Sequence, residues 1–178
     1  MRAHGENDMY YYTGIGSRET PLEILGLMAT IGLRLADHRY TLRSGGADGA
    51  DSAFARGCAS GNGRSEIYLP WVGFNSVQTG IVPTEWGPAL ALAEQFHPAW
   101  DRCSSGARKL HARNGFQVLG LDLATPSRFV MCWTRGGLGG GGTGQAIRIA
   151  RSKNIPVYDL GGMKDPQAFS QMDPRDWA

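Results

Sequence analysis

Three glycine-rich segments hold the residues whose types and spacing suggest a chemistry. They are Gly14 to Arg18, Ser44 to Asp51, and Gly136 to Gln145, and the last contains four consecutive glycines. Glycine lets the backbone approach a ligand closely, and a helix that begins after such a loop offers unpaired N–H groups and a partial positive charge. Each segment lies between a strand-like run and a helix-like run, as in α/β proteins that hold anionic ligands. We therefore predict that the three segments together bind a phosphorylated small molecule.

Polar groups in these segments extend the same chemistry. Backbone N–H groups around Gly14 to Ser17 and Gly139 to Thr143 are predicted to cradle phosphate oxygens, together with the hydroxyl groups in these ranges and that of Ser44. Arg18 adds a charge-assisted contact. The alternative is that the glycines only form tight turns between strands and helices. Sharp turns seldom need four glycines in a row, which favours the ligand-binding interpretation.

Four further polar residues have two interpretations each. Asp48 and Asp51 lie at a predicted helix start, where a carboxylate either caps free N–H groups or accepts hydrogen bonds from ribose hydroxyls. Asn114 lies within a predicted helix, where asparagine is unfavourable, so a specific polar contact is favoured over plain solvation. His111 is either a base or a surface group, and the surface group is the commoner outcome for a lone histidine beside arginine.

Four aromatic residues also have two interpretations each. Trp71, Phe74, Trp86 and Trp100 either stack on a base of the ligand or pack in the core. The first two belong to residues 71–84, a stretch rich in Gly, Asn, Ser and Thr that follows a predicted strand. Because ligands bind beyond the carboxyl ends of parallel strands, this loop is a candidate lid or wall of the site.

The elements that must position these residues alternate between strands and helices. Strands are predicted at residues 10–13, 39–43, 66–70, 129–134 and 155–160. Helices are predicted at residues 22–36, 51–58, 88–96, 104–118 and 145–153. The β-α-β-α-β order of the first half indicates parallel strands joined by right-handed crossovers. The pattern therefore predicts an α/β fold with a mostly parallel central sheet.

Length and composition are those of a single globular domain. We expect one domain over residues 1–178, with a core at about 10–160 and a surface tail at 161–178. No apolar run reaches the roughly 20 residues of a membrane span, and residues 1–8 lack a signal-peptide core. We therefore expect a cytoplasmic protein with no membrane partner. The net charge of +2 does not by itself indicate nucleic-acid binding.

The cysteine pattern argues against a metal centre. Cys58, Cys103 and Cys132 are widely spaced, form no Cys-x-x-Cys pair and have no nearby histidine at metal-ligand spacing. We expect three buried thiols and no metal site. No cofactor is assigned beyond a nucleotide or ADP-ribose-like ligand.

Four motifs, taken in order along the chain, resemble the SLOG group of Rossmann-like proteins. They are Gly16-Ser17-Arg18, Ser44 to Asp51, Ala112-Arg113-Asn114, and Gly141 to Ala146. The group includes DNA-processing recombination mediators, lonely-guy phosphoribohydrolases, and small nucleotide-binding proteins often carried by phages. This sequence resembles most the short, single-domain, DNA-processing-like members. The resemblance implies a Rossmann-like three-layer sandwich, a homo-oligomer (dimer or higher) and, for a phage-encoded member, location in the host cytoplasm.

The motifs and the resemblance together define one predicted ligand site. Its residues are Gly14, Gly16, Ser17, Arg18, Ser44, Gly45, Gly46, Asp48, Asp51, Trp71, Arg113, Asn114, Gly140, Gly141, Gly142, Thr143 and Gln145. The phosphoribohydrolases carry a Pro-Gly-Gly-x-Gly-Thr-x-x-Glu motif, in which Leu138 and Ala146 occupy the proline and glutamate positions here. Without that glutamate, nothing in the loop stabilises positive charge on ribose as a glycosidic bond breaks. No catalytic residue is assigned, and binding is favoured over catalysis.

Three hypotheses about function follow. The leading one is a protein that binds a nucleotide or nucleotide-derived small molecule as a sensor, carrier or sequestering protein. The second is a single-stranded-DNA-binding recombination mediator, whose basic groove would use Arg102, Arg108, Lys109, Arg113, Arg148, Arg151 and Lys153. These residues equally suit a solvated face. The third is a hydrolase of a nucleotide's N-glycosidic or phosphate bond that uses Asp48 or Asp51 as its acid or base.

Overall fold

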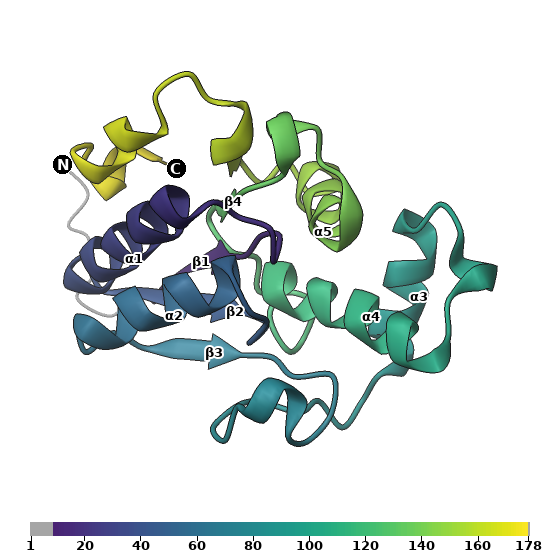
Figure 1. The fold of residues 1–178 in the computed structure, drawn as a ribbon. Coiled ribbons are helices and arrows are strands. Elements are labelled where there is room, and N and C mark those ends of the chain that lie inside the picture. The colour runs from purple at the N-terminus through teal and green to yellow at the C-terminus, as the bar shows by residue number, and fades with distance from the viewer. Residues whose placement is uncertain (1–8, 178) are drawn as a thin grey trace, which may run out of the picture.

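The computed structural model describes residues 9–177, so the expectations for residues 1–8 lie outside the described part of the chain. One sheet of five parallel strands has the order β3-β2-β1-β4-β5 (Figure 1). The strands are β1 (Tyr10–Gly14), β2 (Tyr40–Ser44), β3 (Ser65–Ile67), β4 (Val130–Cys132) and β5 (Val157–Asp159). The α-helices are α1 (Leu22–Asp37), α2 (Ala50–Ser60), α3 (Gly87–Phe96), α4 (Ser105–Leu119) and α5 (Gly141–Ser152). The predicted α/β fold with a parallel sheet is confirmed.

The sheet order creates a switch point beside its central strand. The chain runs from β1 outward to β2 and β3, and later returns to the other side of β1 to form β4 and β5. Tyr10 pairs with Tyr40 of β2, whereas Thr13 pairs with Val130 of β4. The loops that follow β1 and β4 therefore diverge to opposite faces of the sheet. In parallel α/β sheets the crevice between two such loops is the usual place for a ligand.

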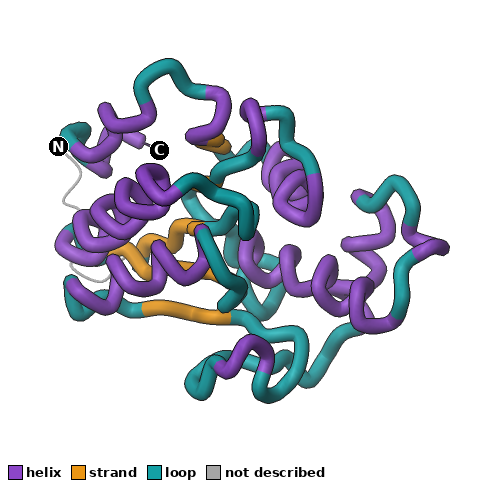
Figure 2. The backbone as a smooth tube through the Cα atoms, viewed as in Figure 1, coloured by secondary structure: helices purple, strands orange, loops and turns teal. Residues whose placement is uncertain are grey.

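Alternation along the strands supplies the two cores that fix this crevice. Phe129 and Met131 join a cluster with α1 and α2, whereas Val130 and Cys132 join a cluster with α4 and α5. This follows from the two-residue period of a strand, which sends successive side chains to opposite faces. The tube in Figure 2 shows the strands lying between helices on both sides. The result is the three-layer arrangement expected from the sequence.

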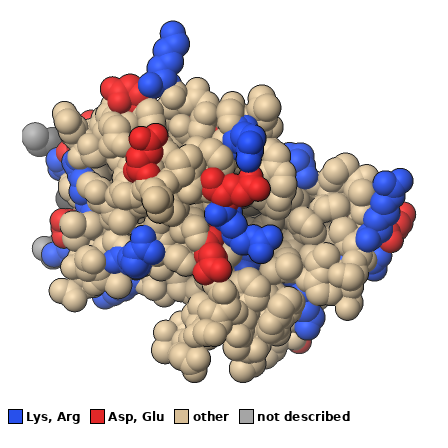
Figure 3. All heavy atoms as spheres, in the orientation of Figure 1, with Lys and Arg blue, Asp and Glu red and all other residues tan. Residues whose placement is uncertain are grey.

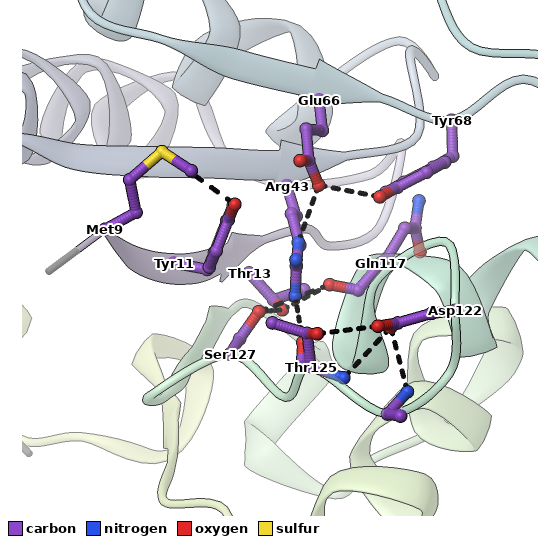
Figure 4. Close-up of polar contacts among 11 residues, drawn as sticks. Met9, Tyr11, Thr13, Arg43, Glu66, Tyr68, Gln117, Asp122, Thr125 and Ser127 are labelled. Carbon is purple, nitrogen blue, oxygen red and sulfur yellow. Dashed lines mark hydrogen bonds and ion pairs between the residues drawn. The ribbon is translucent and has the colours of Figure 1, made fainter.

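A buried arginine joins the β2 end of the sheet to the loop between α4 and β4. Arg43 is 2% exposed, and its Nε donates to Glu66 Oε2 at 2.8 Å while its Nη1 donates to the carbonyl of Thr125 (Figure 4). Nearby, the Thr13 hydroxyl donates to the carbonyl of Gln117 at 2.6 Å, which attaches the last turn of α4 to β1. These bonds satisfy polar groups that burial would otherwise leave unpaired. They also hold α4 in register with the switch point.

The C-terminal segment is part of the core and not only a surface tail. Short 3-10 helices at Pro166–Ser170 and Pro174–Trp177 bring Phe169 and Trp177 against the α1 side of the sheet. Trp177 is 1% exposed, and its carbonyl accepts a hydrogen bond from the Tyr158 hydroxyl. The sequence-based expectation of a surface tail therefore fails for these two aromatic residues, since a large aromatic side chain gains most when it is buried.

Three other features differ from or extend the sequence-based expectations. α5 begins at Gly141, four residues before the predicted Gln145, because the N–H groups of a first helical turn have no intrahelical partner and glycine is tolerated there. β4 and β5 are shorter than predicted. Among residues 9–177, no helix combines the length and apolar character needed to cross a bilayer.

Candidate ligand-binding site

A pocket of about 730 Å³ opens at the carboxyl ends of β1 and β4, which we call the switch-point pocket. Its volume lies within the roughly 300–1,000 Å³ typical of small-molecule sites. All four motifs of the resemblance contribute to its lining. The predicted residues that line it are Gly16, Ser17, Arg18, Asp51, Arg113, Asn114, Gly140, Gly141, Gly142 and Thr143. The structure thus brings together residues up to 127 positions apart in the chain, and their role in binding stays a prediction.

The first turn of α5 forms one wall of the pocket. Gly144 N donates to Gly140 O at 3.2 Å, so the helix ladder begins there. The N–H groups of Gly141, Gly142 and Thr143 precede that bond and have no carbonyl within the helix to pair with. A Cβ at Gly144 would lie 1.8 Å from Gly139 O, so a glycine is needed where the loop crosses the helix. This wall offers free donors and the positive end of a helix dipole.

Several amides of the other two glycine-rich segments are already used. Ile15 N and Ser17 N donate to the carbonyls of Met131 and Trp133, because parallel pairing with β4 continues past the end of β1. Gly45 N donates to Asp51 Oδ2. The prediction that backbone N–H groups around Gly14 to Ser17 cradle phosphate is therefore wrong for Ile15 and Ser17. Of the two predicted backbone cradles, the one at α5 has donors left for a ligand.

Asp51 organises the second segment and faces the pocket. Its Oδ2 accepts hydrogen bonds from Gly45 N at 3.1 Å and Ala47 N at 3.3 Å. Burial raises the pKa of the Asp51 carboxyl to about 6, and the nearby Arg113 charge and the backbone N–H bonds oppose that rise. Of the two interpretations offered by the sequence, N–H capping is present. The N–H groups belong to the preceding loop, however, and not to the start of α2.

Arg113 and Gln117 form the floor beneath this segment. Arg113 Nη1 donates to Gly45 O at 2.7 Å, and its guanidinium lies 5.3 Å from the Phe74 ring centroid. Within the described residues, neither Arg113 Nε nor Gln117 Nε2 has a hydrogen-bond partner. A Cβ at Gly45 would lie 2.0 Å from Gln117 Nε2 and 2.8 Å from Arg113 Cζ. Gly45 is thus needed for close packing, and buried donors without partners mark the floor as energetically costly.

A hydrogen-bonded chain links α4 to α5 along the same wall. Asn114 Nδ2 donates to Gly142 O at 3.1 Å and to Gln145 Oε1 at 2.8 Å. Gln145 Nε2 donates to Ala93 O at 3.0 Å, which fixes the orientation of its amide. His111 Nδ1 lies 3.2 Å from Gln145 Oε1. The sequence-based preference for a polar contact at Asn114 is confirmed, and the preference for His111 as a surface group is wrong, because this half-buried ring lines the pocket.

Charged groups surround the mouth of the pocket. Arg18 is exposed there, and Arg135 Nη2 donates to Glu19 Oε2 at 2.8 Å, so that this exposed pair closes one edge. On the face drawn in Figure 3, basic and acidic side chains are interspersed. Of the seven residues predicted for a basic groove, Arg113 is 8% exposed and lies under the pocket. It therefore belongs to the pocket floor and not to a surface groove.

Seven predicted residues do not line the pocket. They are Gly14, Ser44, Gly45, Gly46, Asp48, Trp71 and Gln145. Ser44 is buried and its hydroxyl donates to Gly14 O at 2.6 Å, whereas Asp48 is exposed and accepts from Asn75. Trp71 packs edge-on against Phe74. Of the four aromatic candidates, Phe74 is the one that reaches the pocket, and it does so as a wall.

Several lining residues were missed by sequence reasoning. Gln117 lies one helical turn beyond Arg113, so the helical period of α4 places both on one face and was the signal that could have found it. Thr134 and Arg135 lie two and three residues beyond the end of β4, and Thr134 was assigned to the predicted strand instead of the site. Glu19, Ala107 and Leu110 also line the pocket, and no sequence feature distinguishes them, whereas Ala47 belongs to the predicted Ser44 to Asp51 segment.

A parallel sheet of this order with helices on both faces defines a Rossmann-like α/β protein. No family model and no curated protein matches the chain. The structure is similar to one titled "Structure of the Chlamydomonas rheinhardtii Moco Carrier Protein", with a TM-score of 0.55 and 17% identity over 96% of this chain and 87% of that chain. At this identity the similarity shows the fold alone. It agrees with the predicted Rossmann-like fold, and the SLOG and DNA-processing assignments stay predictions.

Proposed function

We propose that this protein binds a phosphorylated, nucleotide-like small molecule in the switch-point pocket and carries or sequesters it without converting it. The observation that carries the proposal is the wall formed by α5. The unpaired N–H groups of Gly141 to Thr143 lie at a pocket of small-molecule size. A phosphate placed there would accept several hydrogen bonds and meet the positive end of the helix dipole.

The charges around the pocket support an anionic ligand. Arg18 at the mouth is free to approach a phosphate, and Arg113 supplies a second positive charge from the floor. Asp51 lies beside Arg113 and offsets part of that charge when ionised. The lining also contains Leu110, Leu138 and Phe74, which suit the apolar faces of a base. A ligand with one phosphate end and one aromatic end matches both parts of the lining.

The position of Ala146 supports binding without catalysis. This residue occupies the glutamate position of the phosphoribohydrolase motif, yet it is 0% exposed and packs in the cluster between α4, α5 and the sheet. It does not line the pocket. The similar fold of a protein titled as a carrier agrees with a carrier role.

The test is calorimetric titration of the purified protein with adenine nucleotides, ADP-ribose derivatives and cyclic nucleotides. We expect saturable binding of at least one phosphorylated compound, with one site per chain. Arg18→Gln should weaken it about 10-fold to 100-fold, since a hydrogen bond to a charged group contributes about 1.5–3 kcal/mol. Arg18 is exposed, so this variant should keep the fold.

The matched control is Arg148→Gln with Arg151→Gln, which removes two exposed charges on α5 that do not line the pocket. Small-molecule binding should be unchanged in the control. If the whole panel gives no heat while single-stranded DNA binds and the control loses that binding, the nucleotide proposal is wrong. Salt dependence of the DNA interaction would then give the number of phosphate contacts.

A further inference from the structure

A second cluster of ligating side chains lies beside the switch-point pocket. His97, Cys103 and His111 come from the loop after α3, the loop before α4 and α4 itself. One donor atom from each lies within 4.8 Å of the others, and all three residues are half-buried. Cys103 Sγ is 3.8 Å from both ring nitrogens of His97, and the two imidazole centroids are 4.2 Å apart. The expectation of three buried thiols therefore fails for Cys103, which is half-buried beside two histidines.

We infer that His97, Cys103 and His111 form a binding site for a thiophilic divalent cation such as Zn²⁺, with a fourth position open to water or a ligand atom. Two imidazoles and one thiolate are a donor set that Zn²⁺ favours over Mg²⁺ or Ca²⁺. Bond lengths of about 2.0–2.3 Å place donors of a tetrahedral site roughly 3.3–3.8 Å apart. The separations in this cluster reach that range with small side-chain rotations.

The hydrogen bonds around His111 leave one ring nitrogen free to bind a metal ion. Gln145 Nε2 faces the carbonyl of Ala93, so Gln145 Oε1 is the atom that faces Asn114 and His111. A carbonyl oxygen only accepts hydrogen bonds, so the proton of neutral His111 must be on Nδ1. Its Nε2 then carries a free lone pair. A ligating histidine commonly donates its other ring N–H to a carbonyl in this way.

The other two ligands adjust on binding. His97 Nδ1 now accepts from Ala99 N at 3.1 Å, and coordination through either ring nitrogen ends that hydrogen bond. Loss of one neutral hydrogen bond is small beside the free energy of a metal–ligand set. Cys103 Sγ releases its proton to solvent and binds as thiolate, so one proton leaves per cation bound.

Cobalt substitution tests the site without any assumption about the nucleotide proposal. Chelator-treated protein is titrated with Co²⁺, and thiolate coordination appears as a charge-transfer band in the near ultraviolet. We expect one equivalent to saturate the band and Zn²⁺ to displace it. Cys103→Ser should abolish the band although Cys58 and Cys132 remain, and His111→Gln should weaken binding by more than about 100-fold. His38→Gln, remote from the cluster, is the matched control and should behave as wild type.

A measurement on the wild-type chain removes any dependence on how the variants fold. Cys103 is half-buried, whereas Cys58 and Cys132 are fully buried, so iodoacetamide should label Cys103 first. Zn²⁺ should slow this labelling at least 10-fold, and Mg²⁺ should not. Unchanged labelling with Zn²⁺, or a cobalt band that survives Cys103→Ser, would overturn the inference. In the first case the cluster is a free thiol beside two histidines.

Discussion

The buried carboxyl of Asp51 should make stability depend on pH in a way that one substitution isolates. Burial raises its pKa from 3.8 to about 6 in the folded protein. Between these two values the unfolded chain is ionised while the folded chain keeps its proton, so folding takes up a proton. The contribution of Asp51 to stability is therefore fully present below pH 3.8 and is lost as the pH rises to about 6. Each pH unit in this window is worth about 1.4 kcal/mol, which gives a total of about 3 kcal/mol.

The assay is urea denaturation of wild type and Asp51→Asn at pH 4 and at pH 7. The asparagine keeps an oxygen that accepts from Gly45 N or Ala47 N but cannot ionise. Subtracting the two proteins removes the contribution of other titrating groups. The unfolding free energy of wild type, relative to Asp51→Asn, should fall by about 2 kcal/mol between pH 4 and pH 7, because the unfolded carboxyl is already more than half ionised at pH 4. Asp48→Asn is the matched control in an exposed position of the same loop.

A flat or rising difference would refute the reasoning. A rise would mean that attraction to Arg113 and the two backbone N–H bonds outweigh burial at Asp51. The floor of the pocket would then carry a permanent negative charge well below pH 6. Such a floor would suit a ligand that donates hydrogen bonds better than one that presents phosphate.

Two further pairs of substitutions test packing, one pair at the site and one pair in the C-terminal segment. Gly45→Ala places a Cβ 2.0 Å from Gln117 Nε2. It should lower the free energy of unfolding, measured by urea denaturation, by about 1–3 kcal/mol. It should also weaken ligand binding. Gly142→Ala, where a Cβ meets nothing within 4 Å, should change stability by less than about 0.5 kcal/mol. Equal effects of these two substitutions would contradict the close approach at Gly45. Trp177→Ala should cost about 3–5 kcal/mol because this side chain is 1% exposed, whereas the exposed Met172→Ala should cost little. A small effect at Trp177 would mean that the C-terminal segment is a surface tail after all.

The fold was predictable because its signals are local. Strand-like runs, helical periods and glycine-rich junctions alternate along the chain, and this alternation predicts that the strands are parallel. The predicted start of α5 was wrong by four residues, because a run of glycines is typical of a loop although glycine is tolerated in a first helical turn. Trp177 could not be placed either, because its burial depends on a contact with the sheet that is distant in sequence.

The sequence predicted which residues line the site better than it predicted what each of them does. The glycine-rich motifs and Arg113 with Asn114 do meet at one pocket. Whether an N–H group is free for a ligand depends on pairing between distant segments, such as the bond from Ile15 N to Met131 O. A local sequence pattern does not predict such pairing. The same limit hid the approach of Cys103 to His97 and His111. Their spacing in the sequence resembles no metal motif, and the turn between α3 and α4 brings them together.

The most direct test of the central claim is to let the wild-type protein retain a ligand from a metabolite extract and to identify that ligand by mass spectrometry. Equilibrium dialysis of wild type and Arg18→Gln against the same extract gives the comparison. We predict a phosphorylated small molecule that is enriched with wild type, up to one per chain, and depleted with the variant. Equal enrichment with both proteins, or retention of nothing but oligonucleotides, would contradict the account.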